Sequence, residues 1–166
     1  MISLQTLLLS EHHLVDGFEL DDDQERFAGG TIDDIFKALS QDVERDAIHP
    51  FAIVVDARST GFFVLRESPA LPIWATEDAM TLHSFRVSRS CQGQGIGRAA
   101  LRLIVRWIIT ERPTVVRLML AVNVNNHRAA AFYERCGFLV SGVELEGRIG
   151  RQRVMVLPIS AAPLEL

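Results

Sequence analysis

Three glycines at alternate positions are the first residues whose types and spacing suggest chemistry. Gly93, Gly95 and Gly97 lie between a β-rich run and an amphipathic run, with Arg89 and Arg98 on either side. Glycine lets backbone N–H groups approach a ligand, and the N-terminus of a helix adds a positive partial charge. The spacing indicates a phosphate or pyrophosphate site. A glycine-rich turn that only tightens the packing of strand on helix is the alternative.

Two common phosphate-binding motifs do not fit this loop. The dinucleotide fingerprint GxGxxG, begun at Gly93, meets Arg98 where its third glycine should be, and begun at Gly95 it lacks an acidic ribose partner about 20 residues further on. A Walker A loop needs a lysine, and none stands nearby. The pattern that remains is Gln92-x-x-Gly95-x-Gly97.

A second group of residues follows about thirty positions later. It is the run Asn126-His127-Arg128-Ala129-Ala130-Ala131-Phe132-Tyr133-Glu134-Arg135-Cys136-Gly137-Phe138. Asn126 and Tyr133, the only tyrosine of the chain, lie on one face at helical spacing. An amide and a phenol on one helix face can both hydrogen-bond to a ligand.

Together, the two groups resemble the GNAT superfamily of N-acetyltransferases, over roughly Phe51–Leu157. The resemblance implies that acetyl-CoA is the co-substrate, with its pyrophosphate on the loop backbone and its pantetheine arm beside the strand that ends at Val87. It also implies that Asn126 and Tyr133 approach the pantetheine and the sulfur. The expected cofactor-binding residues are Phe85, Val87, Gln92, Gly93, Gln94, Gly95, Ile96, Gly97, Arg98, Asn126 and Tyr133.

Acetyl transfer to an amine requires a free lone pair, a stabilised oxyanion and a proton for the departing thiolate. We assign Tyr133 as the acid. A free phenol of pKa about 10 protonates a thiolate of pKa about 8.5 uphill by roughly 2 kcal/mol, so Tyr133 should act mainly through a hydrogen bond that strengthens as charge develops on sulfur. A backbone N–H near Phe85 to Val87 should hold the oxyanion.

The base is less clearly indicated. Many members of the superfamily carry a glutamate on the strand before the glycine loop, whereas Ala79–Val87 has none. His83 is the titratable group of suitable pKa on that strand and is the second catalytic candidate. Glu77, Asp78 or Glu25 acting through water are the alternatives.

The acceptor is approached from composition. Residues 1–83 hold 16 acidic and five basic side chains, and residues 84–166 hold five acidic and 12 basic. An acidic half attracts a cation and a basic half a polyanion, although solvated faces of different sign explain the same counts. The stretch Phe18–Phe27, with Pro50–Ile53 and Gly61–Phe62, is similar to the spermine/spermidine acetyltransferase branch. We therefore expect a small cationic amine, such as a polyamine; an aminoglycoside, an amino acid, a protein amine, or a non-catalytic acyl-CoA-binding sensor are the alternatives.

Composition excludes other classes. A chain of 166 residues with 48% hydrophobic and 23% charged residues fits one globular domain, and its net charge of −4 does not favour binding to nucleic acid. No membrane span or signal peptide is visible, so we expect a cytoplasmic protein. His12 and His13 lack a third ligand, so we expect no metal site, and Cys91 and Cys136 have no metal-site spacing. Pairing of edge strands into a homodimer is left open.

The elements that must position these residues follow from hydrophobic periodicity. We expect a mixed α/β (α+β) single domain over 1–166, GNAT-like, with a central mostly antiparallel sheet, a splayed strand pair and flanking helices. Residues 1–50 should form the acceptor-side strand and helices, and 51–157 the acetyl-CoA-binding core. The expected strands are 3–9, 51–55, 61–65, 79–87, 115–122, 138–145 and 151–157; the expected helices are a short one in 11–18, one in the acidic stretch 19–27, and 31–44, 97–112 and 126–135.

Overall fold

The computed structural model describes residues 1–160, so the last six residues of the expected 1–166 domain lie outside the described part. Its elements are β1 (Ile2–Thr6), the 3-10 helix η1 (Leu9–Leu14), α1 (Asp22–Phe27), α2 (Ile32–Gln41), η2 (Arg45–Ala47), β2 (Ile48–Val55), β3 (Arg58–Arg66), β4 (Ala79–Val87), η3 (Arg89–Cys91), α3 (Ile96–Glu111), β5 (Arg117–Asn123), α4 (His127–Arg135), β6 (Leu139–Gly147) and β7 (Gly150–Pro158).

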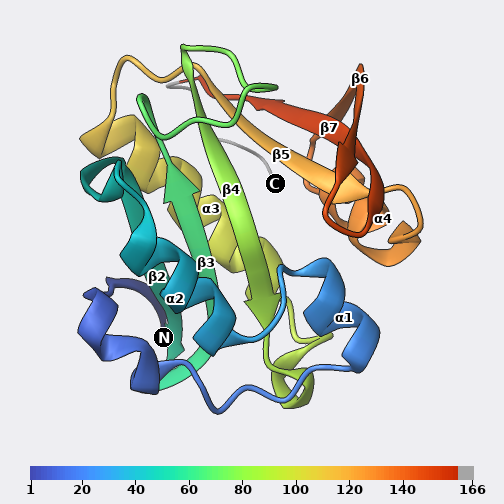
Figure 1. Ribbon diagram of the computed structural model, residues 1–166. Helices are drawn as coiled ribbons and strands as arrows, with labels where there is room; N and C mark the ends of the chain where they lie inside the picture. Colours follow the sequence, from blue (N-terminus) through green and yellow to red (C-terminus); the bar gives the residue numbers. More distant parts are fainter. Residues whose placement is uncertain (161–166) are drawn as a thin grey trace.

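All seven strands lie in one sheet, in the order β1-β2-β3-β4-β5-β7-β6 (Figure 1). Every pair is antiparallel except β4 with β5, which run parallel and pair over only three residues, Ala79–Thr81 with Arg117–Met119. Beyond this seam the two strands diverge. The mixed α/β fold with a mostly antiparallel sheet and a splayed pair is therefore confirmed.

The sheet is covered on both faces, because the side chains of each strand alternate between the two sides. Phe63 packs with Leu101 and Ile104 of α3 in one buried cluster, and its neighbour Phe62 packs with Phe36 of α2 in another. Figure 1 shows α2 in front of the sheet and α3 behind it. Full burial of such side chains stabilises a fold by about 1.5–3 kcal/mol each.

Local signals explain where most elements begin and end. Thr31 accepts a hydrogen bond from the backbone N–H of Asp34 at 3.1 Å and so caps α2, as the sequence predicts. The helix ends at Gln41, three residues earlier than expected, and Val43 is 92% exposed rather than part of the buried stripe.

Several strand boundaries also differ from the expectation, among them the start of β2 at Ile48 and of β5 at Arg117. The first strand ends at Thr6, because residues from Leu9 onward form η1. The β2–β3 turn is only Asp56-Ala57, both at positive φ, so β3 begins at Arg58. A two-residue turn with both residues at positive φ suits the right-handed twist of a hairpin.

Candidate active site

The divergence of β4 and β5 opens a cleft of about 700 Å³. Its walls come from the second half of β4, the end of β5, the glycine loop with the start of α3, one face of α4, and α1 with the residues that follow it. Beyond Thr81, the edge of β4 that faces β5 has no strand partner. Unpaired backbone N–H and C=O groups on that edge are available to a ligand.

The structure brings nearly all of the predicted site residues to this cleft. The lining includes His83, Phe85, Val87, Gln92, Gly93, Gly95, Ile96, Gly97, Arg98, Asn126 and Tyr133. Gln94 does not line the cleft; its side chain donates to the carbonyl of Ser90 at 3.1 Å.

The glycine loop combines both interpretations of its sequence. Gly93 and Gly95 have φ of 75° and 78°, and an added Cβ at either would meet nothing within 4 Å, so the space beside this backbone is open. Gly97 differs, because an added Cβ would lie 3.1 Å from the ring of Phe132. The first two glycines leave room for a ligand, and the third allows close packing of α3 on α4.

The N-terminus of α3 points its free amides into this space. Gly95 is the N-cap and supplies no side-chain cap, and the first intrahelical backbone bond is made by Ala99. The N–H groups of Ile96, Gly97 and Arg98 therefore have no helical partner. Three free amides at the positive end of a 16-residue helix form a site for an anion.

Gln92 holds the loop against three elements. Its Nε2 donates to the carbonyl of Val87 at 2.9 Å, and its Oε1 accepts from Arg128 of α4 at 3.0 Å. Its amide also pairs with that of Gln24 in α1, at 3.2 and 3.3 Å. This glutamine thus fixes the loop relative to β4, α4 and α1 at once.

Tyr133 is 8% exposed and packs against Phe132 and Phe138, with ring centroids 5.3 Å away in each case. Burial raises the pKa of its phenol above the ordinary value, and Cys136 acts in the same direction. The phenol thus stays protonated at neutral pH and can donate a hydrogen bond. One helical face brings it and Asn126, whose side chain caps α4 on the N–H of Ala129 at 3.3 Å, to the cleft.

His83 lines the cleft beside Trp74, with ring centroids 6.2 Å apart, and its Nε2 lies 2.7 Å from the hydroxyl of Thr81. Burial lowers the pKa of His83 to about 3, and the positive charge of Arg66 adds to this effect. A neutral imidazole of such low basicity is a weak acceptor for a proton from an ammonium group. This electrostatic setting does not favour His83 as the base.

Unlike His83, the alternative carboxylates do not line the cleft. Asp78 lies before β4 and pairs with Arg117 at 3.0 Å, and its neighbour Glu77 is exposed. Glu25 is half-buried on α1. Within residues 1–160, the cleft-lining residues include Arg86, with Arg98, Arg128 and Arg135, but no aspartate or glutamate.

Sequence reasoning missed one backbone feature of this wall. Between the pairs Phe62–Arg86 and Val64–His83, β3 has one residue and β4 has two, so β4 bulges at Ser84 and Phe85. Ser84 has φ of 56°, which a residue with a side chain seldom adopts. Bulges re-aim groups beside active sites. The signal that was available is Arg86, a charged residue in the middle of a β-rich run.

Among residues 1–160, no cluster of three or more His, Cys, Asp or Glu side chains is placed to hold a metal ion. None of the described helices combines the length and the apolar character that a membrane crossing requires.

Comparison with known proteins was made next. The family model described as "Acetyltransferase (GNAT) family" matches residues 12–138. An uncharacterized N-acetyltransferase of Bacillus subtilis (strain 168), YbbJ, is 29% identical over 140 residues, which are 83% of this chain and 85% of that protein. The 5-NmdU N-acetyltransferase of Pseudomonas phage PaMx11 is 36% identical over 87 residues, 52% of this chain and 54% of that protein.

Solved structures share the fold. An aminoglycoside acetyltransferase, AAC(6')-Ib, in complex with coenzyme A superposes with a TM-score of 0.74 at 16% identity, covering 95% of both chains. The spermidine N-acetyltransferase of Vibrio cholerae, in complex with CoA and spermine, gives a TM-score of 0.71 at 17% identity, again covering 95% of both chains.

Proposed function

The chain belongs to the acetyltransferase (GNAT) family, and from that premise we propose that it moves the acetyl group of acetyl-CoA to a primary amine of a small acceptor by direct attack in a ternary complex. The observation that carries the proposal is the cleft itself. An open loop with free helix amides lies at one side of it, the unpaired edge of β4 runs along it, and the phenol of Tyr133 faces it.

The residues present fit acetyl-CoA. Its pyrophosphate carries charge that the amides of Ile96–Arg98 can bind, with the guanidinium groups of Arg98 and Arg128 nearby on the cleft wall. Its pantetheine arm has amides that can pair with the unpaired edge of β4 near Phe85 and Val87. The co-substrate supplies the activated thioester.

The chemistry forms a C–N bond and breaks a C–S bond. The free amine attacks the thioester carbonyl, and the oxygen takes up negative charge, which a backbone N–H on the bulged part of β4 stabilises. The C–S bond then breaks, the departing thiolate accepts a hydrogen bond from the phenol of Tyr133 and takes up a proton from solvent, and the amine nitrogen loses its extra proton to solvent. Since burial raises the pKa of the phenol, Tyr133 keeps its proton and stabilises the charge on sulfur as a hydrogen-bond donor; it is not suited to the base role.

Deprotonation of the acceptor is assigned to water rather than to a side chain. His83 remains a catalytic prediction from the sequence, but its low basicity favours a role as a neutral wall of the acceptor side. Water connecting the cleft to Glu25 is a route consistent with the position of α1, whose residues Gln24 and Phe27 line the cleft.

The acceptor class divides into two candidates. The acidic N-terminal part of α1, with Asp21–Asp23 and Glu25, lies on the same short helix as the cleft residues Gln24 and Phe27 and favours a polyamine. The cleft wall itself consists mainly of apolar side chains, side-chain amides and arginines. This lining favours an amine with fewer positive charges. The division into residues 1–50 on the acceptor side and 51–157 on the acetyl-CoA side stays a prediction. A cytoplasmic location stays a prediction from the sequence.

Release of CoA thiol from acetyl-CoA tests the proposal against a panel of spermidine, spermine, putrescine, kanamycin, lysine and a lysine peptide. Amine-dependent release by the wild-type chain is the expected result. Release with polyamines alone selects the first acceptor candidate, and release with another amine selects the second. Binding of acetyl-CoA without release with any amine contradicts catalysis and favours an acyl-CoA-binding module.

A further inference from the structure

Arg86 is the one arginine of the cleft wall that is almost fully buried, at 4% exposure. It lies on β4 and is the first residue back in register with β3 after the bulge. A guanidinium has five N–H donors and keeps its charge in proteins, so its burial is costly unless those donors are used. Its partners therefore indicate what the burial achieves.

The guanidinium donates to carbonyls of two different segments. Nη1 donates to Gly30 at 2.9 Å and Nη2 donates to Ala28, both in the corner between α1 and α2. Nε donates to Ser84, the bulge residue of its own strand, at 3.3 Å. One buried side chain thus connects the α1–α2 corner, defined as residues 28–30, to the bulge of β4.

The corner and the bulge also touch directly. Gly29 and Gly30 have φ of 98° and 95°, and an added Cβ on Gly29 would lie 3.1 Å from the hydroxyl of Ser84. The carbonyl groups at the end of a helix lack intrahelical partners and carry partial negative charge, which suits a cation. Burial lowers the pKa of Arg86 to about 10, while the charge of Glu25 on α1 opposes that shift, so the guanidinium is positive at neutral pH.

These contacts lie where an acceptor must enter. Ala28 and Gly29 of the corner, and Ser84 and Phe85 of the bulge, all line the cleft. A shift of the corner would change the width of the cleft beside the backbone that is proposed to hold the oxyanion. Small displacements of this kind reduce turnover strongly because attack depends on alignment.

Resting on the proposed acetyltransferase function, we propose that Arg86 is a positioning residue of the acceptor site, which clamps the α1–α2 corner to the bulge of β4 and so sets where the amine lies against the thioester. The clamp reaches only the α1–α2 corner and Ser84, so we expect the pyrophosphate site at the N-terminus of α3 to keep its affinity when Arg86 is replaced. The proposal therefore separates acceptor use from acetyl-CoA binding.

The role is tested by the kinetics of Arg86→Met and Arg86→Lys. These are measured with acetyl-CoA and the panel amine that gives the fastest thiol release. We expect kcat/KM for the amine to fall about 10- to 100-fold in Arg86→Met and less in Arg86→Lys, which keeps a donor and the charge. The Kd for acetyl-CoA should stay within about twofold. Arg153→Met is the matched control: it removes a half-buried arginine of β7 that does not line the cleft, and it should leave both constants unchanged. An equal loss in acetyl-CoA affinity, or unchanged amine kinetics, overturns the proposal.

Hydrogen exchange gives a readout that does not depend on turnover. The amides of Ala28, Gly29 and Gly30 are hydrogen-bonded back into α1 and should exchange at least tenfold faster in Arg86→Met than in the wild type or Arg153→Met. Unchanged exchange shows that no clamp exists, whether or not any amine is acetylated. If the clamp is seen but the wild type acetylates nothing on the panel, the proposed function fails and the positioning role falls with it.

Discussion

Tyr133 combines two properties that rarely coincide in a core side chain. It is packed between aromatic rings on three sides, by Phe85, Phe132 and Phe138, yet it also lines the cleft. Its hydroxyl donates no hydrogen bond to another side chain or carbonyl among residues 1–160, so the proton is free for a ligand in the cleft. Packing fixes the position of the ring, and burial holds the proton on it.

Tyr133→Phe keeps the ring and removes that proton. We expect kcat for thiol release to fall roughly 100-fold, within the range by which general acids accelerate reactions, with Tm and the Kd for acetyl-CoA little changed. Because the pKa of the phenol is raised, no loss of activity between pH 7 and 9 should come from its ionisation. Full turnover by the phenylalanine variant would show that the acid assignment is wrong.

Gly95 is tested by a pair of variants with the same backbone strain. Gly95 and Gly142 have φ of 78° and 84°, and an added Cβ would be unobstructed at either, but only Gly95 lines the cleft. We expect Gly95→Val to weaken acetyl-CoA binding in calorimetry at least 100-fold, because its side chain fills the space beside the helix amides, with native far-UV circular dichroism. Gly142→Val should bind as the wild type does. Equal losses in both variants, or none in Gly95→Val, contradict the loop assignment.

At the scale of single residues, spacing in the sequence identified most of the predicted residues that line the cleft, but not the contacts of Arg86. The glycines lie within one strand–loop–helix unit, and Tyr133 lies on one face of a single helix. Within such short units, the period of the element relates the position of a residue in the sequence to the direction of its side chain. Arg86 donates to carbonyls more than 50 residues away, and the bulge at Ser84 lies beside Gly29. Contacts between segments so far apart leave no local pattern.

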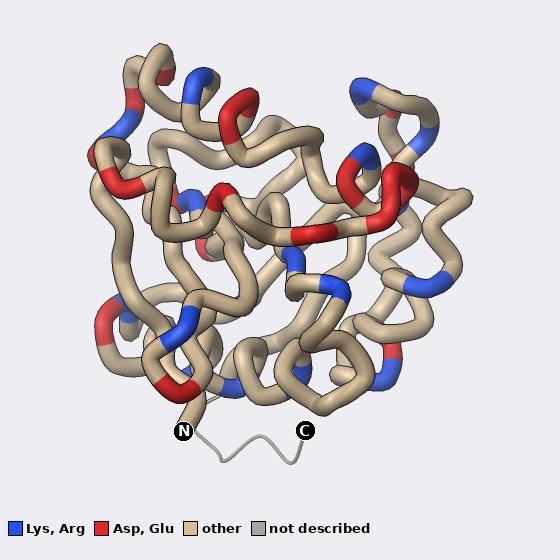
Figure 2. Tube along the Cα trace, turned by 90° about the horizontal axis from the view of Figure 1, so that it is seen from below, with Lys and Arg blue, Asp and Glu red and all other residues tan. Residues whose placement is uncertain are grey.

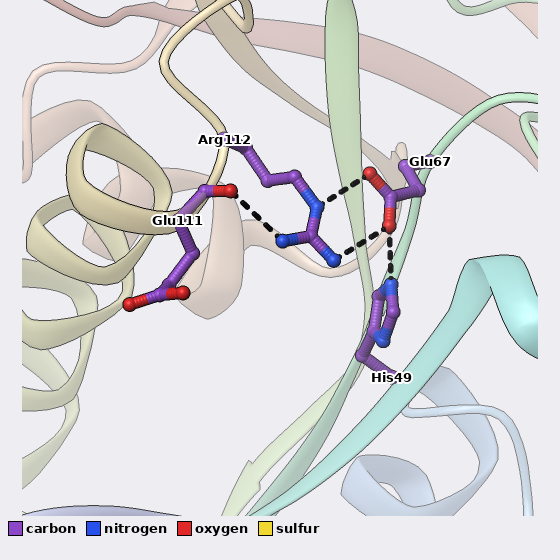
Figure 3. Close-up of polar contacts among 4 residues, drawn as sticks. All are labelled: His49, Glu67, Glu111 and Arg112. Atoms are coloured by element: carbon purple, nitrogen blue, oxygen red, sulfur yellow. Dashed lines mark hydrogen bonds and ion pairs between the residues drawn. The ribbon is translucent and has the colours of Figure 1, made fainter.

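Helix α3 links two distinct parts of the molecule. Its N-terminus begins in the cleft, and its C-terminus is followed by Arg112, which forms the network in Figure 3. Arg112 donates to both carboxylate oxygens of Glu67, at 2.7 and 3.0 Å, and Nε2 of His49 lies 2.6 Å from the same carboxylate. The network joins β2, the end of β3 and α3, so it fixes the far end of the helix whose near end forms the proposed anion site.

Removing the charge of Glu67 tests the strength of this network. Burial alone would raise the pKa of Glu67. Hydrogen bonds from Arg112 and His49 lower this pKa by more than burial raises it, so it lies below its ordinary value. The carboxylate therefore stabilises the fold fully above the unfolded-state pKa of about 4.3 and loses this effect as the pH falls through the folded-state pKa. We expect Glu67→Gln to reduce the free energy of unfolding at pH 7 by about 1–2 kcal/mol.

Urea unfolding at pH 7 and at pH 3.5 measures this difference. The difference in the free energy of unfolding between the wild type and Glu67→Gln should be smaller at pH 3.5 than at pH 7. Glu111→Gln, on the adjacent helix end, is the control and should change stability by less than about 0.5 kcal/mol, the range of ordinary surface substitutions. A gap that is the same at both pH values would show that the charge of Glu67 contributes nothing.

Helices and strands were predicted best where the hydrophobic pattern extends over many residues. The strand Ala79–Val87 and the helices α3 and α4 lie within a residue or so of their expected limits. The errors of prediction lie at the ends of elements. At Val43, for example, an apolar side chain continues the helical spacing after α2 has already ended. The short parallel seam between β4 and β5 depends on a pairing of strands separated by α3, so it was expected from the resemblance and not from periodicity.

At the scale of the whole molecule, the opposite charges of the two halves of the sequence do not form two faces. Figure 2 shows Lys and Arg mixed with Asp and Glu on both sides of the view. The boundary between the halves falls inside β4, at the cleft, where the lining charges are arginines. The local charge at the cleft is therefore a better guide to ligands than the net charge of −4.

Ionic strength tests this local charge. Arg98, Arg128 and Arg135 at the cleft should attract the phosphates of acetyl-CoA, and salt screens such attraction over about 10 Å at 0.1 M and 3 Å at 1 M. We expect the Kd for acetyl-CoA to rise about three- to tenfold between 50 and 500 mM NaCl. Acetylpantetheine, which lacks the phosphates, is the control and should show no such slope. A Kd for acetyl-CoA that is independent of salt contradicts the role of these arginines.

The divergence of β4 and β5 also affects how the molecule avoids aggregation. A sheet edge that faces bulk solvent is a template for pairing with another chain. The two edges created by the divergence face one another across the cleft, where a small extended ligand fits. The outer edges are β1 and β6, and β6 carries exposed apolar side chains at Leu139, Val140 and Val143 beside a register shift. Strand pairing between copies, as in the homodimer that stays a prediction, would therefore use the outer edges, while the inner edges are left to a small ligand.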